Sequence, residues 1–154
     1  MSAYWDVLEA VERTVVADER FRDVRVTIRK RPTLKPLVDR FPQLVVAPRE
    51  DLTESVVGRQ SESMWVGYDV YLGLFTDARD DVEILQRRLD YRQFLRELFQ
   101  RPKSLQQKVN NVWNTEYDPR PAVGFGPDTP APNVDYSWQR FTFVDYRTKG
   151  FTFM

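Results

Sequence analysis

The chain has 154 residues, a length that suits one ordinary domain with its own core. Hydrophobic residues make up 42% of it and charged residues 30%, a composition that argues against disorder. The 23 basic and 23 acidic residues cancel, so net charge gives no general attraction to nucleic acid or membrane. Because cysteine and histidine are absent, disulfides and cysteine-based metal sites are excluded and the commonest general base is missing.

The start of the chain carries Asp6 and Glu9 and lacks the cationic and then apolar layout of a signal peptide. The longest apolar runs are too short to span a bilayer. We therefore expect a protein that folds in a cytoplasm and has no membrane partner.

The first half of the chain predicts a helix followed by two strands. Trp5, Leu8, Val11 and Val15 recur at helical spacing, which predicts an N-terminal helix with these side chains toward the core. Strict alternation predicts a strand at 24–30, and a compact apolar run predicts a buried strand at 44–47. Three prolines between 31 and 42 predict an irregular connection.

Residues 49–63 are polar and charged and predict a long loop or arm. The next segment, 64–75, predicts a long strand that is apolar on both faces, with Trp65, Tyr71 and Phe75 on one of them. A single layer of helices can cover only one face. Either a second subunit covers the other face, or the sheet curls and covers itself.

The second half predicts a helix and two or three strands. An acidic start and a broad apolar arc, which includes Leu85 and Leu89, predict a helix over 80–100. Strands are expected at 109–117 and 136–146. Between them, five prolines at 118–133 exclude a regular element.

These elements together predict an α+β fold. We expect a mostly antiparallel β-sheet with one N-terminal helix and one long central helix packed on one face. We expect a single domain over 1–154, with loops or arms at 49–63 and 118–133. The C-terminal segment 147–154 either returns as a short strand or docks on a neighbouring subunit.

No arrangement of residues predicts catalysis. The six glycines form no phosphate-binding loop, and the pair Gly124 and Gly126 indicates a turn. Neighbouring acids at 50–51 and 80–81 are typical of helix caps and solvated faces. Nothing argues for magnesium bound by scattered carboxylates, although the sequence leaves it open. We therefore predict no catalytic residue, no cofactor and no metal site.

A basic cluster holds five cations and no acid: Arg25, Arg29, Lys30, Arg31 and Lys35. Such a cluster can contact nucleic-acid phosphates, or it can be the solvated face of a strand and its following loop. The zero net charge and the lack of interleaved aromatic residues favour the solvated face.

Exposed aromatic residues are the more informative feature. Trp65, Tyr71 and Phe75 on the long strand, and Phe151 and Phe153 near the last residue, predict contacts between subunits because exposed apolar patches usually find a partner.

The layout resembles the tail-terminator, or tail-completion, proteins of long-tailed bacteriophages, and more loosely other phage neck proteins. The resemblance covers most of the chain. It rests on the opening helix with Trp5-Asp6-Val7-Leu8, the run Leu44-Val45-Val46-Ala47 closed by Pro48, the strand at 64–75, and the arginine-rich helix before the final strands. The segments 49–63 and 118–133 are longer than a minimal member of the family needs.

The resemblance implies a structural virion protein without enzymatic activity. It implies a homohexameric ring that caps the tail tube, joins it to the neck, and assembles in the host cytoplasm. Its partners would be copies of itself, the tube protein and a neck protein. If the basic cluster faced the lumen of the ring, it would contact passing DNA. Two alternatives stay open: a head-completion, stopper or other neck protein, and a monomeric ligand-binding module or small carboxylate-dependent enzyme.

Overall fold

A computed structural model describes residues 3–34, 41–49, 51–53, 55–60, 63–77, 81–100, 112–118 and 134–148. For 55–60, 63–65, 112–117 and 145–148 it describes the backbone alone. The arm expected at 118–133 lies outside the described residues, except for Asp118. The C-terminal segment is described only up to Thr148.

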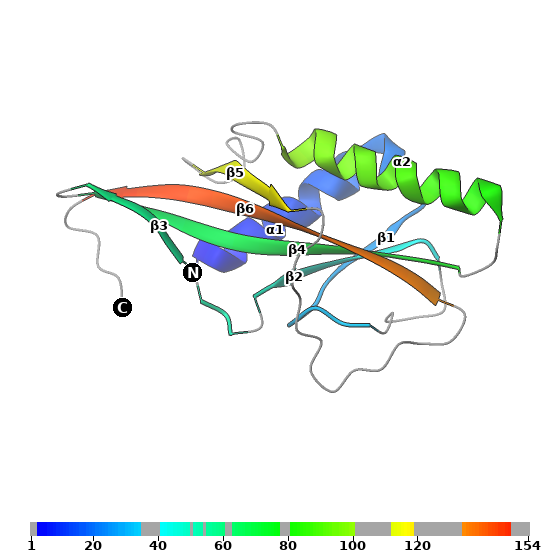
Figure 1. Ribbon diagram of the computed structural model, residues 1–154, viewed down its shortest axis with the longest axis horizontal. Coiled ribbons are helices and arrows are strands. Elements are labelled where there is room, and N and C mark those ends of the chain that lie inside the picture. Colours follow the sequence, from blue (N-terminus) through cyan, green and yellow to red (C-terminus); the bar gives the residue numbers. More distant parts are fainter. Residues whose placement is uncertain are drawn as a thin grey trace.

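The described residues form an α+β fold in which two helices cover one face of a six-stranded sheet (Figure 1). The two helices are α1 (Ala3–Ala17) and α2 (Val82–Phe99), and a short 3-10 helix, η1 (Glu19–Phe21), follows α1. The strands are β1 (Arg25–Ile28), β2 (Gln43–Pro48), β3 (Ser55–Gln60), β4 (Ser63–Asp77), β5 (Val112–Asp118) and β6 (Val134–Thr148). The order across the sheet is β1-β2-β4-β6-β5, with β3 also paired to β4. The predicted fold class is therefore confirmed.

The sheet is mostly antiparallel, as predicted, but its first pair of strands is parallel. Arg25 to Ile28 run in parallel beside Gln43 to Val46, whereas β4 runs antiparallel to β2, β3 and β6. The segment 49–63 was predicted to be a long loop or arm, and an irregular loop over its whole length is wrong because residues 55–60 form β3. This strand has no apolar alternation, and its regular structure comes from backbone pairing with β4 between Ser55↔Gly67 and Gln60↔Ser63.

The helical face carries the main core, and its first helix is turned relative to the prediction. The buried residues of α1 are Tyr4, Val7, Leu8, Ala10, Val11 and Val15. Trp5, expected in the core, is 44% exposed. On the sheet side the core contains Leu44 and Val46 of β2, alternate residues of β4, and Phe141 and Phe143 of β6. The ring of Phe99, the last residue of α2, packs in an edge-to-face arrangement with both of these phenylalanines.

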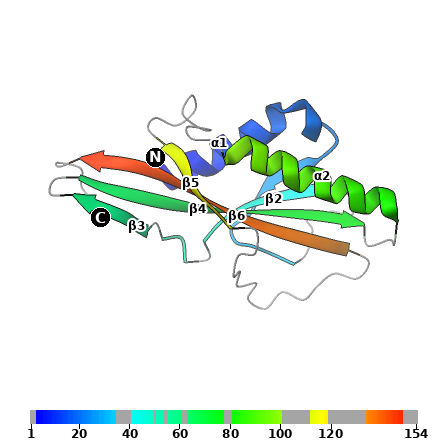
Figure 2. The same ribbon diagram turned by 45° about the horizontal axis from the view of Figure 1, so that its top comes forward.

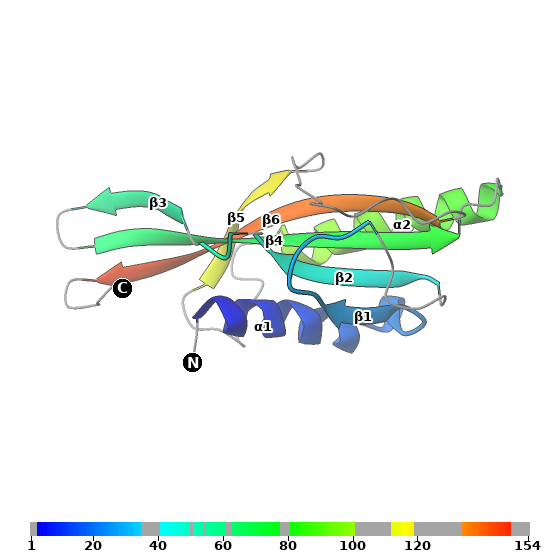
Figure 3. The same ribbon diagram turned by 90° about the horizontal axis from the view of Figure 1, so that it is seen from below.

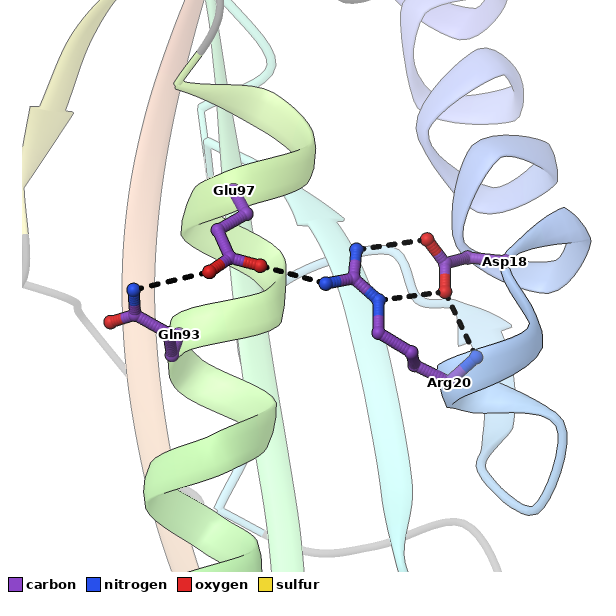
Figure 4. A network of polar contacts seen from close by, with 4 residues as sticks. All are labelled: Asp18, Arg20, Gln93 and Glu97. Atoms are coloured by element: carbon purple, nitrogen blue, oxygen red, sulfur yellow. Dashed lines mark hydrogen bonds and ion pairs between the residues drawn. The ribbon is translucent and has the colours of Figure 1, made fainter.

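A polar network joins η1 to α2 on the surface above this core (Figure 4). The Arg20 guanidinium donates to both carboxylate oxygens of Asp18, and it donates to Glu97 at 2.7 Å. It also lies 4.6 Å from the ring centroid of Phe94. Asp18 caps η1 by accepting from the Arg20 N–H. The network therefore fixes the end of the first helical segment against α2.

The opposite face of the sheet carries a second, smaller apolar cluster. Val45, Ala47, Tyr71, Phe75 and Trp138 are buried in it. The segment that follows β1 passes below the sheet on this side (Figure 3), and its residues Thr33 and Leu34 are buried. The sequence left open whether a second subunit or the chain itself covers this face. At Tyr71 and Phe75 the chain itself covers it.

Glycine at position 73 is required by the way this second cluster packs. Gly73 lies directly opposite Trp138 in the β4–β6 register. The indole lies over the glycine so closely that a Cβ there would be 2.5 Å from Trp138 Cζ2. A side chain at this position would therefore displace the indole from the cluster.

The two longest strands extend beyond both helices at one end of the sheet (Figures 1 and 3). β4 and β6 each span 15 residues. At the projecting end, β4 pairs with β3 on one side and with the last residues of β6 on the other. In this register Trp65 lies between Gly58 and Tyr146. We call the projecting parts of β3, β4 and β6 the ribbon.

Tyr4 stabilises the point where β4 changes partners. The β3 register ends at Gly67 and the β2 register begins at Val70, so neither strand continues alongside Tyr68 and Asp69. The Tyr4 hydroxyl donates to the Asp69 carbonyl at 2.6 Å and accepts from the Arg49 N–H at 3.0 Å. The start of α1 is therefore bonded to the sheet at the base of the ribbon.

Candidate functional site

An apolar hollow opens between the start of α1, the end of β1 and the turn after β2. Its volume is about 360 Å³, and it is lined by Trp5, Leu8, Ile28, Arg29, Lys30, Pro48 and Leu52. These residues come from separate parts of the chain because β1 pairs with β2 and α1 packs across both strands. We refer to it as the hollow.

The turn that carries Leu52 holds this residue in an unfavourable backbone conformation. Leu52 has a φ of 59°, in the left-handed region that a leucine rarely adopts, and its side chain is 59% exposed. Asp51 stabilises the turn by accepting from the N–H and the hydroxyl of Thr53 and by pairing with Arg49 at 3.2 Å. The Thr53 bonds and the Arg49 charge hold the pKa of Asp51 below its ordinary value. The turn thus presents an apolar side chain to solvent at the rim of the hollow.

The rim of the hollow carries positive charge. The backbone N–H of Arg29 donates to the Val46 carbonyl at 2.8 Å, which fixes the end of β1. Within the described part of the chain, the Arg29 guanidinium and the Lys30 ammonium form no ion pair. An apolar hollow with two uncompensated cations favours a ligand or partner that is apolar and acidic.

The second exposed apolar surface lies on the first half of α2. Val82, Leu85 and Leu89 are 79%, 52% and 57% exposed, and their spacing places them along one side of the helix. We call these three residues the α2 stripe. It contradicts the prediction that Leu85 and Leu89 belong to the buried arc.

Contacts with β6 fix the rotation of α2. Arg88 pairs with Asp135 at 3.3 Å, Arg92 donates to the Ser137 hydroxyl, and the Gln139 amide donates to the Arg92 carbonyl at 3.4 Å. Tyr91 and Leu95 are buried against the sheet side. The helix therefore cannot turn to bury the stripe without losing these contacts.

Charged residues of both signs lie on the exposed part of α2. Glu83 and Asp90 are exposed and form no ion pair among the described residues. Asp81 caps the helix by accepting from the Glu83 N–H at 2.8 Å. Arg87 follows Glu83 by four residues and precedes Asp90 by three, so it lies on the same side of the helix as these acids, and it also lines a separate hollow. By the same spacing Arg92 lies beside Leu85 and Leu89, so the charge around the stripe is mixed.

That separate hollow, of about 220 Å³, lies beneath the start of α2. It is lined by Phe41, Pro42, Thr76, Asp77, Ile84 and Arg87. The buried Thr76 hydroxyl has no hydrogen-bond partner among the residues that the structure describes. In the described residues no three acidic side chains come together as a metal site.

The structure redefines the predicted subunit-contact residues. Tyr71 and Phe75 are buried beneath Trp138 and the partly buried Phe41 and Val134, so the prediction that they form a subunit surface is wrong. Burial raises the pKa of the Tyr71 phenol, helped by the nearby Asp69 charge. The Trp65 backbone lies in the ribbon, but its side chain is outside the description. Phe151 and Phe153 lie outside the described residues.

The predicted basic cluster lies along β1 and the segment after it. Arg25 and Lys30 are exposed, and Arg29 and Arg31 are half-buried. The structure therefore brings Arg29 and Lys30 to the rim of the hollow. Lys35 lies outside the described residues.

Sequence reasoning did not single out the hollow or the stripe. Leu52 is an isolated leucine in a polar stretch, a signal that can be seen but does not reveal its left-handed backbone. Neither described α-helix is long and apolar enough to cross a membrane. No protein-family model matches the chain, and no curated protein matches it at a significant level.

Proposed function

We propose that the chain is a structural, non-enzymatic virion protein of a long-tailed bacteriophage. In this proposal it acts as a tail terminator, forming a homo-oligomeric ring, with six subunits expected, that caps the tail tube and joins it to the neck. The observation that carries the proposal is the presence of two different exposed apolar surfaces, the hollow and the α2 stripe.

Two unlike surfaces are what a ring requires. Each subunit of a cyclic ring larger than a dimer offers one patch to one neighbour and a different patch to the other. The start of α1, at the hollow, and the start of α2, at the stripe, lie toward opposite ends of the long axis (Figures 1 and 2). Both surfaces can therefore be occupied at the same time.

The ribbon supports contacts outside the ring. It extends past both helices, and β3 pairs with β4 alone among the described strands. A strand with one unpaired edge can accept a strand from another protein through backbone hydrogen bonds. We propose that the ribbon reaches the tube or the neck. β1 forms an edge of the sheet. Its basic residues would contact passing DNA only if the β1 edge faced the lumen of the ring.

Deleting the gene from a phage that encodes the chain tests the function. If the ring stops tube growth, the deletion should leave headless tails with tubes of irregular, excessive length in negative-stain images. Complementation with the wild-type gene should restore normal length. Tubes of normal length without heads would instead indicate a stopper or neck protein, and intact infectious particles would contradict both assignments.

One observation favours a second candidate of another class. The apolar lining of the hollow and its two cations suit an amphipathic carboxylate, as expected of a ligand-binding module. Titration of a medium-chain fatty acid while Trp5 fluorescence is followed, with Trp5→Phe as the reference, separates the two candidates. Saturable binding by a persistently monomeric chain would favour the module.

A further inference from the structure

We infer that the first turn of α1 is a latch that holds the hollow in shape. Its working part is the Tyr4 hydroxyl, which lies within the ladder of backbone hydrogen bonds between β2 and β4. While the hydroxyl is inserted, the ladder stays open and the hollow is formed. When the hydroxyl withdraws, the ladder closes and the rim of the hollow shifts. The role of the hollow in assembly rests on the proposed ring, but the latch is a property of the single chain.

The register of the sheet places Arg49 opposite Asp69. The pairing of β2 with β4 ends at Pro48↔Val70, so Arg49 and Asp69 form the next pair in the same register. A regular antiparallel ladder would join this pair by a bond from the Arg49 N–H to the Asp69 carbonyl, provided that the backbone of Arg49 faces β4.

The direction of the backbone in β2 meets this condition. The Val46 carbonyl accepts from the Arg29 N–H at the end of β1, so the backbone groups of Val46 face β1 and not β4. Backbone groups alternate in direction along a strand, so those of Ala47 and Arg49 face β4. The sheet is therefore arranged for a direct bond between Arg49 and Asp69.

The Tyr4 hydroxyl occupies the place of that bond. The Arg49 N–H donates to the hydroxyl at 3.0 Å, and the hydroxyl donates to the Asp69 carbonyl at 2.6 Å. A direct N–H···O=C bond spans only about 2.9 Å, so the inserted oxygen keeps the two backbones apart. Both backbone groups stay hydrogen-bonded, which is what allows the ladder to be open at a buried position.

The two sides of the open pair are held unequally. Asp69 lies in β4, which pairs with β6 over its whole length, and the Asp69 carboxylate accepts from the Thr142 hydroxyl at 2.7 Å. Arg49 follows the end of β2 and begins the turn that carries Leu52. Closure of the ladder therefore draws Arg49 toward β4 and leaves Asp69 in place.

The turn at the rim of the hollow moves with Arg49. The Leu52 N–H donates to the Arg49 carbonyl at 3.0 Å, and the Arg49 guanidinium pairs with Asp51 at 3.2 Å. Leu52 has the strained φ of 59°, and such strain persists only where the surroundings enforce it. The inserted hydroxyl is part of those surroundings, so closure of the ladder lets the turn relax and shifts Leu52 from the rim.

The first turn of α1 also supplies part of the lining of the hollow. Trp5 follows Tyr4 in the chain, and Leu8 lies one helical turn after Tyr4. The Tyr4 ring packs against the Tyr68 ring, with 5.2 Å between their centroids, and holds this turn against the sheet. Withdrawal of Tyr4 therefore moves Trp5 as well as Leu52. Any contact that binds the formed hollow in turn stabilises the latched state.

Two substitutions of Tyr4 test the latch on the single chain. Tyr4→Phe removes the hydroxyl but keeps the ring at the opening, so the ladder should stay open with the Arg49 N–H unpaired. Tyr4→Leu keeps an apolar side chain in the core but is too short to fill the opening, so the ladder should close. Tyr4→Ile is equally short and repeats the test if the leucine variant does not fold.

Scalar couplings across hydrogen bonds, measured by NMR, report which carbonyl binds the Arg49 N–H. A coupling between the Arg49 nitrogen and the Asp69 carbonyl carbon should be absent in the wild type and in Tyr4→Phe, and present in Tyr4→Leu. The preceding bonded pair, Ala47 and Tyr71, should give its coupling in all three chains and is the internal control. The Arg49 amide should exchange with deuterium several-fold faster in Tyr4→Phe than in the other two chains.

Two results of this measurement overturn the latch. A coupling between Arg49 and Asp69 in the wild type would show that the hydroxyl is not inserted in the ladder, and this result does not depend on the folding of any variant. A folded Tyr4→Leu chain that lacks the coupling and exchanges its Arg49 amide quickly would show that the ladder does not close.

Sedimentation velocity tests whether the latch governs assembly. Tyr4→Leu should self-associate at least about tenfold more weakly than the wild type, because the rim of its hollow is displaced. Val15→Ala is the matched control, since it removes buried volume from the same helix at a position outside the hollow. It should lower the free energy of unfolding and still associate like the wild type.

The outcomes separate the latch from the proposed ring. If Tyr4→Leu assembles as well as the wild type although its ladder is closed, the ring stands and the latch does not govern the hollow. An equal loss of association in Val15→Ala would show that assembly follows stability, which also overturns the inference. If the wild type never assembles, the proposed ring fails, and the couplings still decide whether the ladder opens and closes as inferred.

Discussion

Replacing Tyr4 with phenylalanine tests the tie between α1 and the base of the ribbon. The substitution removes a buried hydroxyl that donates to Asp69 at 2.6 Å and accepts from Arg49 at 3.0 Å. Each such bond contributes about 0.5–1.5 kcal/mol net, so losing both should lower the free energy of unfolding by about 2 kcal/mol. For a chain of this size, that shifts the midpoint of urea unfolding down by roughly 1 M.

The pH dependence of this difference gives a sharper check. Burial raises the pKa of Tyr4 above its ordinary value, so the folded chain keeps a proton that the unfolded chain releases near pH 10. The stabilisation from Tyr4 is therefore fully present below about pH 10 and falls by up to about 1.4 kcal/mol per unit above it. Since phenylalanine does not titrate, the gap between wild type and Tyr4→Phe should narrow as the pH rises above about 10.

Tyr91→Phe is the matched control at neutral pH. Tyr91 is also buried in the helical core, but its hydroxyl makes no hydrogen bond among the described residues. Its removal should change the free energy of unfolding by less than about 0.5 kcal/mol. If Tyr4→Phe costs no more than this control, or if its deficit stays constant from pH 8 to pH 11, the hydroxyl does not fix this junction.

Two further substitutions test the packing on either face of the sheet. Gly73→Ala should lower the free energy of unfolding by at least about 1 kcal/mol and shift the tryptophan emission, because the new Cβ would lie 2.5 Å from Trp138 Cζ2. An unchanged spectrum and an unchanged stability would show that the indole does not cover Gly73. Arg20→Ala should cost about 1 kcal/mol, with a loss that shrinks in high salt, because it removes the pairs with Asp18 and Glu97 and the contact with Phe94. Arg22 is more exposed and its ion pairs are 4.0 Å long, so Arg22→Ala should cause no measurable loss of stability. Equal losses of stability in Arg20→Ala and Arg22→Ala would refute the role given to the network.

The elements with a strong apolar pattern were predictable from the sequence. The run at 44–47 and the two-faced strand at 64–75 lie in β2 and β4, since their composition alone demands burial in a sheet. β3 was missed because residues 55–60 carry no apolar alternation, and their structure depends on pairing with a partner strand. The parallel pairing of β1 with β2 was likewise invisible, because alternation shows that a strand exists without showing its neighbour.

The candidate site was less predictable than the fold for a physical reason. The helical spacing of α1 fits a core face centred on Trp5 as well as one centred on Tyr4. What decides between them is the bond from the Tyr4 hydroxyl to Asp69, 65 residues away in the chain. Similarly, the apolar arc of α2 is broad enough to include Leu85, and only the contacts of Arg88 and Arg92 with β6 show which part of the arc is exposed.

The mass of the assembled chain tests the central proposal most directly. Native mass spectrometry should be run on the purified chain across a wide concentration range, alone and with isolated tail tubes. The account predicts one closed species whose mass is a whole-number multiple of 18.3 kDa, formed at high concentration or at the tube end and depleted by Leu85→Lys. A chain that remains an 18.3 kDa monomer under both conditions would contradict it.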